Sequence, residues 1–319
     1  MVPDVNHDLS TRIKDKAYEL GFNQVGISRA DADGRAEDKL SVWLSRGFHG
    51  EMTWMERTAD KRRNIKNVFP DIRSVVSVAV NYYTDHAPQE TGGKGRISRY
   101  AWGDDYHYII TDWVRQLATW IDAEAEKEGI PCESRTYVDT GPILEKAWAQ
   151  RAGIGWVGKH SNLVSAEYGS WLLLGEVLLT VDLEPDMPAP DQCGACRLCI
   201  EICPTDAIPE PYVLDATKCI AYLTIEHRGP IPAPYHFDMG NRIFGCDDCL
   251  DICPYNEHAV PTFERAFEPR TYALSPDLKE LAEQTPAEFQ ITFKKSPLKR
   301  AKYEGLQRNV AIARKNDSQ

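Results

Sequence analysis

Apolar residues along the chain follow first a helical and then a strand-like spacing, and the two patterns alternate up to about residue 183. Helical spacing covers residues 9 to 20, about 35 to 47, and 105 to 129, the longest amphipathic stretch. Runs that predict strands lie at 23–28, 74–83, 134–139, 162–165 and 171–183. Pro142 suits the first turn of a helix after the third run. This alternation predicts an α/β or α+β domain over residues 1–185.

The pattern changes at the proline-rich stretch EPDMPAPDQ, residues 184 to 192, which predicts a linker. Eight of the nine cysteines are near or beyond it. After Pro254 the apolar spacing is helical again, to the C-terminus. We therefore expect three regions: a catalytic domain at 1–185, a cysteine-bearing domain at 186–258 and a short helical region at 259–319.

Charge and composition narrow the class of protein. A formal net charge of -11 argues against a chain that coats nucleic acid non-specifically, although residues 290 to 319 hold eight basic and only two acidic residues. The N-terminal residues contain no apolar signal region and no twin arginine, and no apolar run is long enough to span a bilayer. We expect a cytoplasmic protein without a membrane segment. In that compartment cysteines are more often metal ligands or catalytic groups than disulfides.

The first cysteine motif, CGACRLCIEICP at residues 193 to 204, has the spacing C-x2-C-x2-C-x3-C-P of bacterial ferredoxins. In such proteins three thiolates bind one [4Fe-4S] cluster and the fourth binds a second cluster. The second motif, CDDCLDICP at 246 to 254, has only three cysteines, and Cys219 is the remaining downstream cysteine that can complete it. We assign one cluster to Cys193, Cys196, Cys199 and Cys253. We assign the other to Cys203, Cys219, Cys246 and Cys249.

Two alternatives accompany this assignment. Four-cysteine zinc sites also use C-x2-C pairs, but zinc fits poorly with a tight cluster followed by C-P that occurs twice. Cys132 stands apart from both motifs, and we expect a buried small residue there rather than a nucleophile.

The region before the clusters is too long for a bare electron carrier, so it must bind what the electrons reduce. It contains no phosphate-binding P-loop and no dinucleotide fingerprint. Asp139, in YVDTGP, follows a predicted strand and precedes a predicted helix. It could cap that helix, or it could act as a general acid. The acid role at neutral pH would require burial to raise its pKa from ~3.9 to about 7, at a cost of about 4 kcal/mol.

Several segments together resemble the epoxyqueuosine reductase family. They are DKRRN (60–64), RYAWGDDYH (99–107), VDTGPILEKAWA (138–149), GWVGKHSNL (155–163), GSWLLLGE (169–176), both cysteine motifs, CIAYLTIEHRGPIP (219–232) and the terminal SPLKR and LQRNVAIA. The resemblance covers nearly the whole chain. It implies reduction of epoxyqueuosine to queuosine at the wobble position of tRNA, with cobalamin reduced through two [4Fe-4S] clusters. It also implies a cobalamin-binding α/β domain similar to that of reductive dehalogenases, followed by a ferredoxin-like domain.

The resemblance also implies roles for individual residues. Asp139 falls where the family has its proton donor. The residues that it places in or beside the corrin site are Arg62, Asp139, Lys159, Asn162, Trp171 and Asp247. The D-x-H-x-x-G signature is absent, so the cobalamin is expected base-off without a histidine lower ligand. Reduced cobalt could attack the epoxide or donate an electron to it.

Trp102 departs from the family's usual residue in its motif and is expected to alter the pocket.

The expected partners are a tRNA that carries epoxyqueuosine and an external electron donor, of flavodoxin or ferredoxin type or a chemical reductant. We expect a monomer. The residues predicted to contact the tRNA are His227, Arg228, Lys299, Arg300 and Arg308, while a solvated helix face is the alternative for the basic segment. Two other functions remain open on sequence alone. A reductive dehalogenase would normally carry a twin-arginine signal, and a non-catalytic electron carrier would not bind cobalamin.

Overall fold

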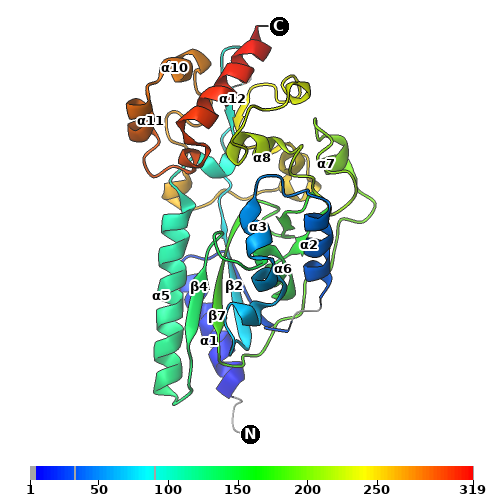
Figure 1. Cartoon of the computed structure of the whole chain (residues 1–319). Coiled ribbons are helices and arrows are strands. Elements are labelled where there is room, and N and C mark those ends of the chain that lie inside the picture. Colours follow the sequence, from blue (N-terminus) through cyan, green and yellow to red (C-terminus); the bar gives the residue numbers. More distant parts are fainter. Residues whose placement is uncertain (1–4, 32–33, 90, 319) are drawn as a thin grey trace. The chain divides into compact units, whose positions relative to one another are not determined.

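The computed structural model describes residues 5–31, 34–89 and 91–318. The chain folds into two compact units that are not contiguous in sequence (Figure 1). Unit 1 comprises 1–46, 54–81 and 106–195, and unit 2 comprises 47–53, 82–105 and 196–319. Unit 2 therefore contains most of the predicted cysteine-bearing region, all of the C-terminal region and two segments from the N-terminal third of the chain.

Unit 1 is built on a four-stranded sheet of order β1-β2-β7-β4. Its strands are β1 (Gln24–Arg29), β2 (Ser74–Asn81), β4 (Ser134–Tyr137) and β7 (Leu172–Leu179). Every neighbouring pair is antiparallel, which makes the unit α+β, one of the two predicted classes. All eight residues of β2 are buried, as expected for an inner strand rich in valine that is covered on both faces.

Helices cover both faces of this sheet. Gly175 of β7 faces Val114 and Ile110 of the long helix α5, whereas Gly26 of β1 faces Ala152 at the end of α6. A Cβ on Gly26 would lie 1.9 Å from the carbonyl oxygen of Ala152, so this close approach requires glycine. The helices of unit 1 are α1 (Val5–Glu19), α2 (Arg35–Ser45), α4 (Ala59–Arg63), α5 (Tyr106–Lys127) and α6 (Glu145–Arg151). Helix α3 (Thr53–Arg57) begins in unit 2 and continues into unit 1.

The predicted start of a helix at Pro142 is wrong, because α6 begins only at Glu145. Residues 138 to 144 instead form an irregular segment between β4 and α6. Two short strands, β5 (Trp156–Val157) and β6 (Leu163–Val164), form a separate hairpin after α6. The segment before α6 and this hairpin hold three of the six residues predicted for the catalytic site, namely Asp139, Lys159 and Asn162.

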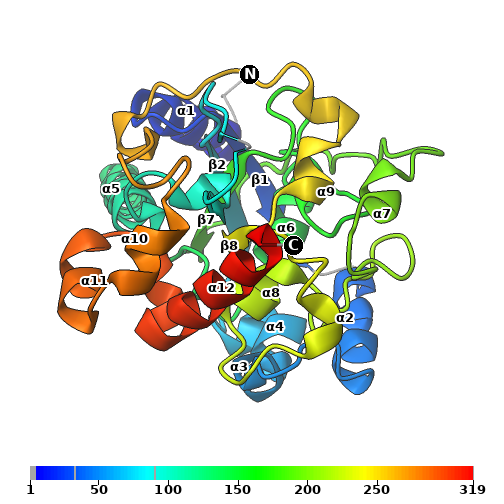
Figure 2. The same ribbon diagram turned by 90° about the horizontal axis from the view of Figure 1, so that it is seen from above.

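Unit 2 consists of short elements and one long helix at the C-terminus. They are β3 (Arg96–Ile97), α7 (Leu198–Glu201), α8 (Ile220–Ile225), β8 (Arg242–Phe244), α9 (Asp248–Asp251), α10 (Leu278–Glu283), α11 (Pro286–Thr292) and α12 (Lys302–Asp317). Strands β3 and β8 pair in parallel. Figure 2 shows α12 passing over β8, with α8 and α10 beside it.

The core of unit 2 forms where α12 packs on β8. Leu306, Val310 and Ala313 recur at helical spacing on one face of α12 and are buried with Ile243 and Phe244 of β8. This packing places the three C-terminal helices in the same core as β8, which lies between the two cysteine motifs. The described part of the chain contains no helix long and apolar enough to cross a bilayer.

Candidate active site

Asp139 lies in the irregular segment between β4 and α6, with its side chain 57% exposed. Its φ is +56°, in the left-handed region that non-glycine residues seldom adopt. Its backbone N–H donates to Oε1 of Glu145 at 2.5 Å, which helps to hold this conformation. The N-cap position of α6 is Leu144, which makes no side-chain capping hydrogen bond, so Asp139 does not cap this helix. The capping alternative is therefore wrong.

His107 is the side chain in direct contact with the Asp139 carboxylate. Its Nε2 lies 3.1 Å from Oδ2 of Asp139, although the two residues are 32 positions apart. The His107 ring is stacked on Tyr106, with centroids 4.1 Å apart and an angle of 26° between the planes. Tyr106 also hydrogen-bonds Asp139. Two consecutive residues at the start of α5 thus hold the carboxylate.

The electrostatic environment of Asp139 differs from the one expected. Desolvation raises its pKa, but hydrogen bonds and positive charge from His107, the charge of Lys146 and a hydrogen bond from Tyr106 outweigh it. The pKa therefore lies below the ordinary value, not near 7. An isolated Asp139 carboxylic acid with a pKa near 7, the requirement set out for the acid role, is therefore not present, and a neighbouring group would have to supply the proton.

Two more charged groups, Lys146 and Arg62, lie close to Asp139. Lys146 donates to Oδ1 of Asn162 at 2.6 Å and to the Ser161 carbonyl at 2.9 Å, which fixes the hairpin loop beside α6. Arg62 donates to Oγ1 of Thr58 and, at 2.8 Å, to the Ile143 carbonyl. Desolvation lowers the pKa of Arg62, and the charges of Glu145 and Asp139 partly offset this effect. Arg62, Asp139 and Asn162, all predicted for the site, thus belong to one polar group in unit 1.

The other predicted corrin residues of unit 1 lie deeper. Lys159 is only 8% exposed, and its Nζ donates to the Gly194 carbonyl at 2.6 Å. Trp156 donates through Nε1 to Sγ of Cys193 at 3.3 Å. Trp171 is 2% exposed and belongs to the core. The hairpin therefore holds the segment that carries the first cysteine, a function for Lys159 that sequence analysis missed.

Four cysteines of unit 2 gather in one place. Cys249 interacts electrostatically with Cys203, Cys219 and Cys246, and Cys219 also interacts with Cys203. Backbone N–H groups donate to several of these sulfurs, including that of Ala207 to Cys203 at 3.2 Å. Burial raises the pKa of the Cys219, Cys246 and Cys249 thiols, so a cationic group is needed to keep them ionised together.

This donor set fits the cluster predicted from the displaced Cys219. In the described residues, no three Cys, His, Asp or Glu side chains converge on a position for a single metal ion. A cubane has a different requirement, because each of its four thiolates binds a different iron atom. Of the ligands predicted for the other cluster, Cys199 in α7 is buried and Cys253 precedes a short turn after α9.

Asp247 and Trp102 line a cavity of about 50 Å³ within unit 2. The Asp247 carboxylate accepts hydrogen bonds from the Ser98 hydroxyl and, at 2.6 Å, from the Arg99 backbone N–H. Burial raises its pKa, and these hydrogen bonds partly offset the effect. Trp102 is 2% exposed, and its Nε1 donates to the Ile97 carbonyl at 2.8 Å. Trp102 is thus part of the unit 2 core as well as of this cavity.

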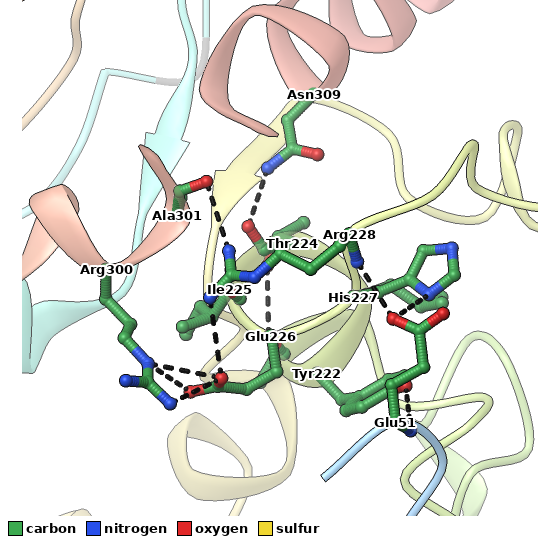
Figure 3. A network of polar contacts seen from close by, with 12 residues as sticks. Glu51, Tyr222, Thr224, Ile225, Glu226, His227, Arg228, Arg300, Ala301 and Asn309 are labelled. Carbon is green, nitrogen blue, oxygen red and sulfur yellow. Dashed lines mark hydrogen bonds and ion pairs between the residues drawn. The ribbon is translucent and has the colours of Figure 1, made fainter. Parts of the chain in front are cut away.

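Three of the residues predicted to contact tRNA, His227, Arg228 and Arg300, surround the end of α8 (Figure 3). Arg300 forms three hydrogen bonds to the Glu226 carboxylate and remains 54% exposed. Arg228, 40% exposed, donates to the carbonyls of Ile225 and Ala301. The ring nitrogens of His227 face two acceptors, the Glu51 carboxylate at 3.2 Å and the Pro230 carbonyl at 3.1 Å.

Arg308 is engaged differently from the other basic residues. Its guanidinium donates to the carbonyls of Leu223, His227 and Gly229 and to Oδ1 of Asn309. The side chain therefore holds the loop that carries His227 and Arg228. Lys299 is exposed on the turn before α12.

Sequence reasoning missed His107, Glu145, Lys146 and Glu176. Each lies inside a segment that had drawn attention for other residues, and Glu176 interrupts the apolar run WLLLGEVLL of the strand predicted at 171–183. A carboxylate in such a strand was a usable signal, because a buried charge needs a specific partner.

Comparison with known proteins shows which class of enzyme has this fold and site. Residues 62–140 match the family model "Epoxyqueuosine reductase QueG, DUF1730", and residues 192–256 match that of a 4Fe-4S double cluster binding domain. A solved epoxyqueuosine reductase in complex with an epoxyqueuosine-modified tRNA-Tyr stem loop has a TM-score of 0.88 and 29% identity, covering 97% of this chain and 82% of that chain. A second solved epoxyqueuosine reductase, from Bacillus subtilis, has its catalytic aspartate loop swung out of the active site. Its TM-score is 0.87 at 28% identity, and the match covers 97% of this chain and 82% of that chain. The fold and site thus define an oxidoreductase with a double iron–sulfur cluster domain.

Curated relatives identify the family. The epoxyqueuosine reductase of Synechocystis sp. is 45% identical over 89% of this chain and 96% of its own length. That of Gloeobacter violaceus is 44% identical over 95% of each, and that of Escherichia coli is 40% identical over 97% of this chain and 81% of its own length. The chain belongs to the epoxyqueuosine reductase family. This confirms the expected family, the enzyme class and an α+β domain joined to a ferredoxin-like module.

Proposed function

We propose that this enzyme reduces epoxyqueuosine to queuosine in tRNA. The observation that carries the proposal is the pairing of Asp139 with His107, in a chain of this family that also has a double-cluster domain. Removal of the epoxide oxygen as water consumes two electrons and two protons. The chain therefore needs both an electron store and a renewable proton donor.

Asp139 is the proposed donor to the leaving oxygen. His107 is positioned to return a proton to Asp139, because its Nε2 contacts the carboxylate directly and its side chain is 34% exposed to solvent. The left-handed conformation at Asp139 and the hydrogen bond to Glu145 set the direction of the carboxylate. In the relative from Bacillus subtilis the aspartate loop moves. We propose that the loop of this chain moves as well.

Cobalamin is the proposed cofactor at this site, where it would supply the electrons that reach the epoxide. Asp139 and Asn162 present polar groups of the kind that bind the amides at a corrin rim, and Arg62 supports the segment between them. The proposed set of cobalamin-site residues also includes Lys159, Trp171 and Asp247. Because Lys159 and Trp171 are buried, they are proposed to support the site from the protein interior. The base-off state without a histidine lower ligand remains part of the proposal.

Two [4Fe-4S] clusters are proposed with the ligand sets predicted above. The gathering of Cys203, Cys219, Cys246 and Cys249 supports the second set. The N–H groups that donate to these sulfurs are the kind of contact that adjusts the reduction potential of such clusters. For the first set, Trp156 provides a hydrogen bond to Cys193. An external donor of flavodoxin or ferredoxin type would deliver the electrons to a cytoplasmic monomer.

The exposed side chains of Arg228, Lys299 and Arg300 are proposed to contact tRNA phosphates. Glu226 holds Arg300 in place, and Arg308 acts on the RNA through the loop that it supports. His227 is mostly enclosed, with 17% of its side chain exposed, so it is proposed to contact the anticodon loop only at its edge.

Replacing Lys299 and Arg300 together with alanine is expected to weaken tRNA binding by the same factor whatever the nucleotide sequence of the tRNA. Each lost contact to single-stranded phosphate lowers the slope of log K against log salt by about 0.7, so a total change of about 1.4 is expected. Binding measured across a salt series checks this. The matched control changes the exposed Arg314 and Lys315, also in the C-terminal region. Equal slopes for both double variants would argue against the proposed contacts.

The function itself is tested by mass spectrometry of nucleosides from epoxyqueuosine-containing tRNA. The tRNA is incubated without oxygen with the reconstituted, reduced enzyme, with and without cobalamin. Loss of one oxygen atom from the modified nucleoside only when cobalamin is present is the expected result. An unchanged nucleoside, in a sample whose clusters and corrin are intact, would refute the proposal.

A further inference from the structure

Glu176 is a buried carboxyl group in the middle of the unit 1 sheet. It lies on β7 opposite Ser77 of β2 and Tyr137 of β4, and its side chain is 0% exposed. Its neighbour Gly175 faces α5. Because side chains alternate along a strand, Glu176 points to the other face, where α6 packs. A carboxyl group there is costly unless it is neutral or paired.

The group that meets Glu176 is another carboxyl, that of Glu145 at the start of α6. Within the described part of the chain, neither oxygen of Glu176 receives a hydrogen bond from an N–H or O–H donor. Two ionised carboxylates cannot bond to one another, since both only accept. Their contact therefore requires one proton between them.

The charges around the pair favour retention of that proton. Desolvation, followed by the charge of Asp139, raises the pKa of Glu145 to about 7, while Arg62 acts in the opposite direction. Desolvation and the charges of Glu145 and Asp139 raise the pKa of Glu176. The charged groups that face the pair are thus Asp139 from the loop and Arg62 from α4.

The pair is joined to the proposed proton donor through the backbone. Oε1 of Glu145 accepts the N–H of Asp139, whose backbone is in the left-handed region. When the shared proton is lost, Glu145 and Glu176 become adjacent buried anions beside the Asp139 carboxylate. Their repulsion is relieved if Glu145 moves, and this movement would release Asp139.

We propose that a proton shared between Glu145 and Glu176 holds the Asp139 loop in its catalytic position, so that the pair is a pH-dependent positioning element. This inference rests on the proposed role of Asp139. Glu145 and Glu176 are positioning residues, since they act through Asp139.

Glu176→Gln provides the main test, because an amide N–H replaces the shared proton at nearly the same size. In the wild-type holoenzyme the single-turnover rate is expected to fall about tenfold per pH unit once the shared proton is lost, above about pH 7. In Glu176→Gln the part of this alkaline fall that comes from the shared proton is expected to disappear, whereas the part that comes from the Asp139–His107 pair remains. The control, Glu133→Gln, changes an exposed glutamate of the same unit and should keep the wild-type profile.

Infrared spectroscopy of the same proteins tests the pair without catalysis. The carbonyl band of a protonated carboxylic acid should be present in the wild type at neutral pH, decline as the pH rises, and be absent from Glu176→Gln. If Glu176→Gln does not fold, Glu145→Gln serves instead, because its amide can still accept the Asp139 N–H and donate to Glu176. A missing band, or an unchanged alkaline fall in the folded variant, would overturn the inference. An inactive enzyme that shows the band would instead count against the proposed function alone.

Discussion

Asp139→Asn is expected to slow epoxide reduction by about 10²- to 10⁴-fold, the usual contribution of a positioned general acid. Asparagine keeps the shape of the side chain, and the hydrogen bond to the Glu145 side chain uses only the backbone N–H of residue 139. Cobalamin and tRNA should therefore still bind. The measurement is a single-turnover rate on saturating modified tRNA, with corrin content determined from the absorption spectrum of each sample.

The matched control is Asp112→Asn, at an exposed position of α5 in the same unit. It should leave the rate unchanged. His107→Gln is expected to give a smaller loss, which added imidazole partly restores, because His107 acts by returning a proton to Asp139. Full turnover by Asp139→Asn with corrin bound would show that another group donates the proton.

Cys219→Ala is expected to remove one of the two clusters and to abolish turnover. A [4Fe-4S] cluster is held by four thiolates, and Cys219 interacts with Cys203 and Cys249 in the group proposed for the second cluster. Iron and sulfide should fall to about half of the wild-type content. Electron paramagnetic resonance of the reduced protein should then show a single remaining cluster.

Cys132→Ala is the control for this variant. Cys132 lies in unit 1, where burial raises the pKa of its thiol to about 12, and it is distant in sequence from both motifs. Its replacement should leave iron, sulfide and turnover unchanged. If Cys219→Ala keeps both clusters, a different residue must complete the second set.

The strands and helices of unit 1 were largely predictable because each depends on a short local pattern. The runs at 74–83 and 171–183 became the inner strands β2 and β7, and the stretch at 105–129 became α5. The failure at Pro142 has a local cause as well. Proline favours a first helical turn, but the backbone of Asp139 is in the left-handed region and the residues after it are irregular. Helix α6 therefore begins only at Glu145.

The sequence by itself determined the cysteine motifs and the position of Asp139 at the end of a strand. Cysteines separated by two residues can reach the same cluster whatever the rest of the chain does, so their spacing was enough to predict a double-cluster domain. The resemblance of several segments to one family added the reaction and the cofactor class. None of this required knowledge of which strands pair.

Only the tertiary structure decided which groups meet Asp139 and Glu176. Contacts between residues far apart in sequence depend on strand order and on which face each helix covers, and neither follows from a local pattern. Antiparallel pairing and α6 bring Glu145 against Glu176, while α5 brings His107 to Asp139. The same reason explains Arg308, which looked free for RNA in a basic segment but donates to backbone carbonyls of a loop about 80 residues earlier. The pKa of Asp139 is set by these neighbours, and so its direction could not be derived from the sequence.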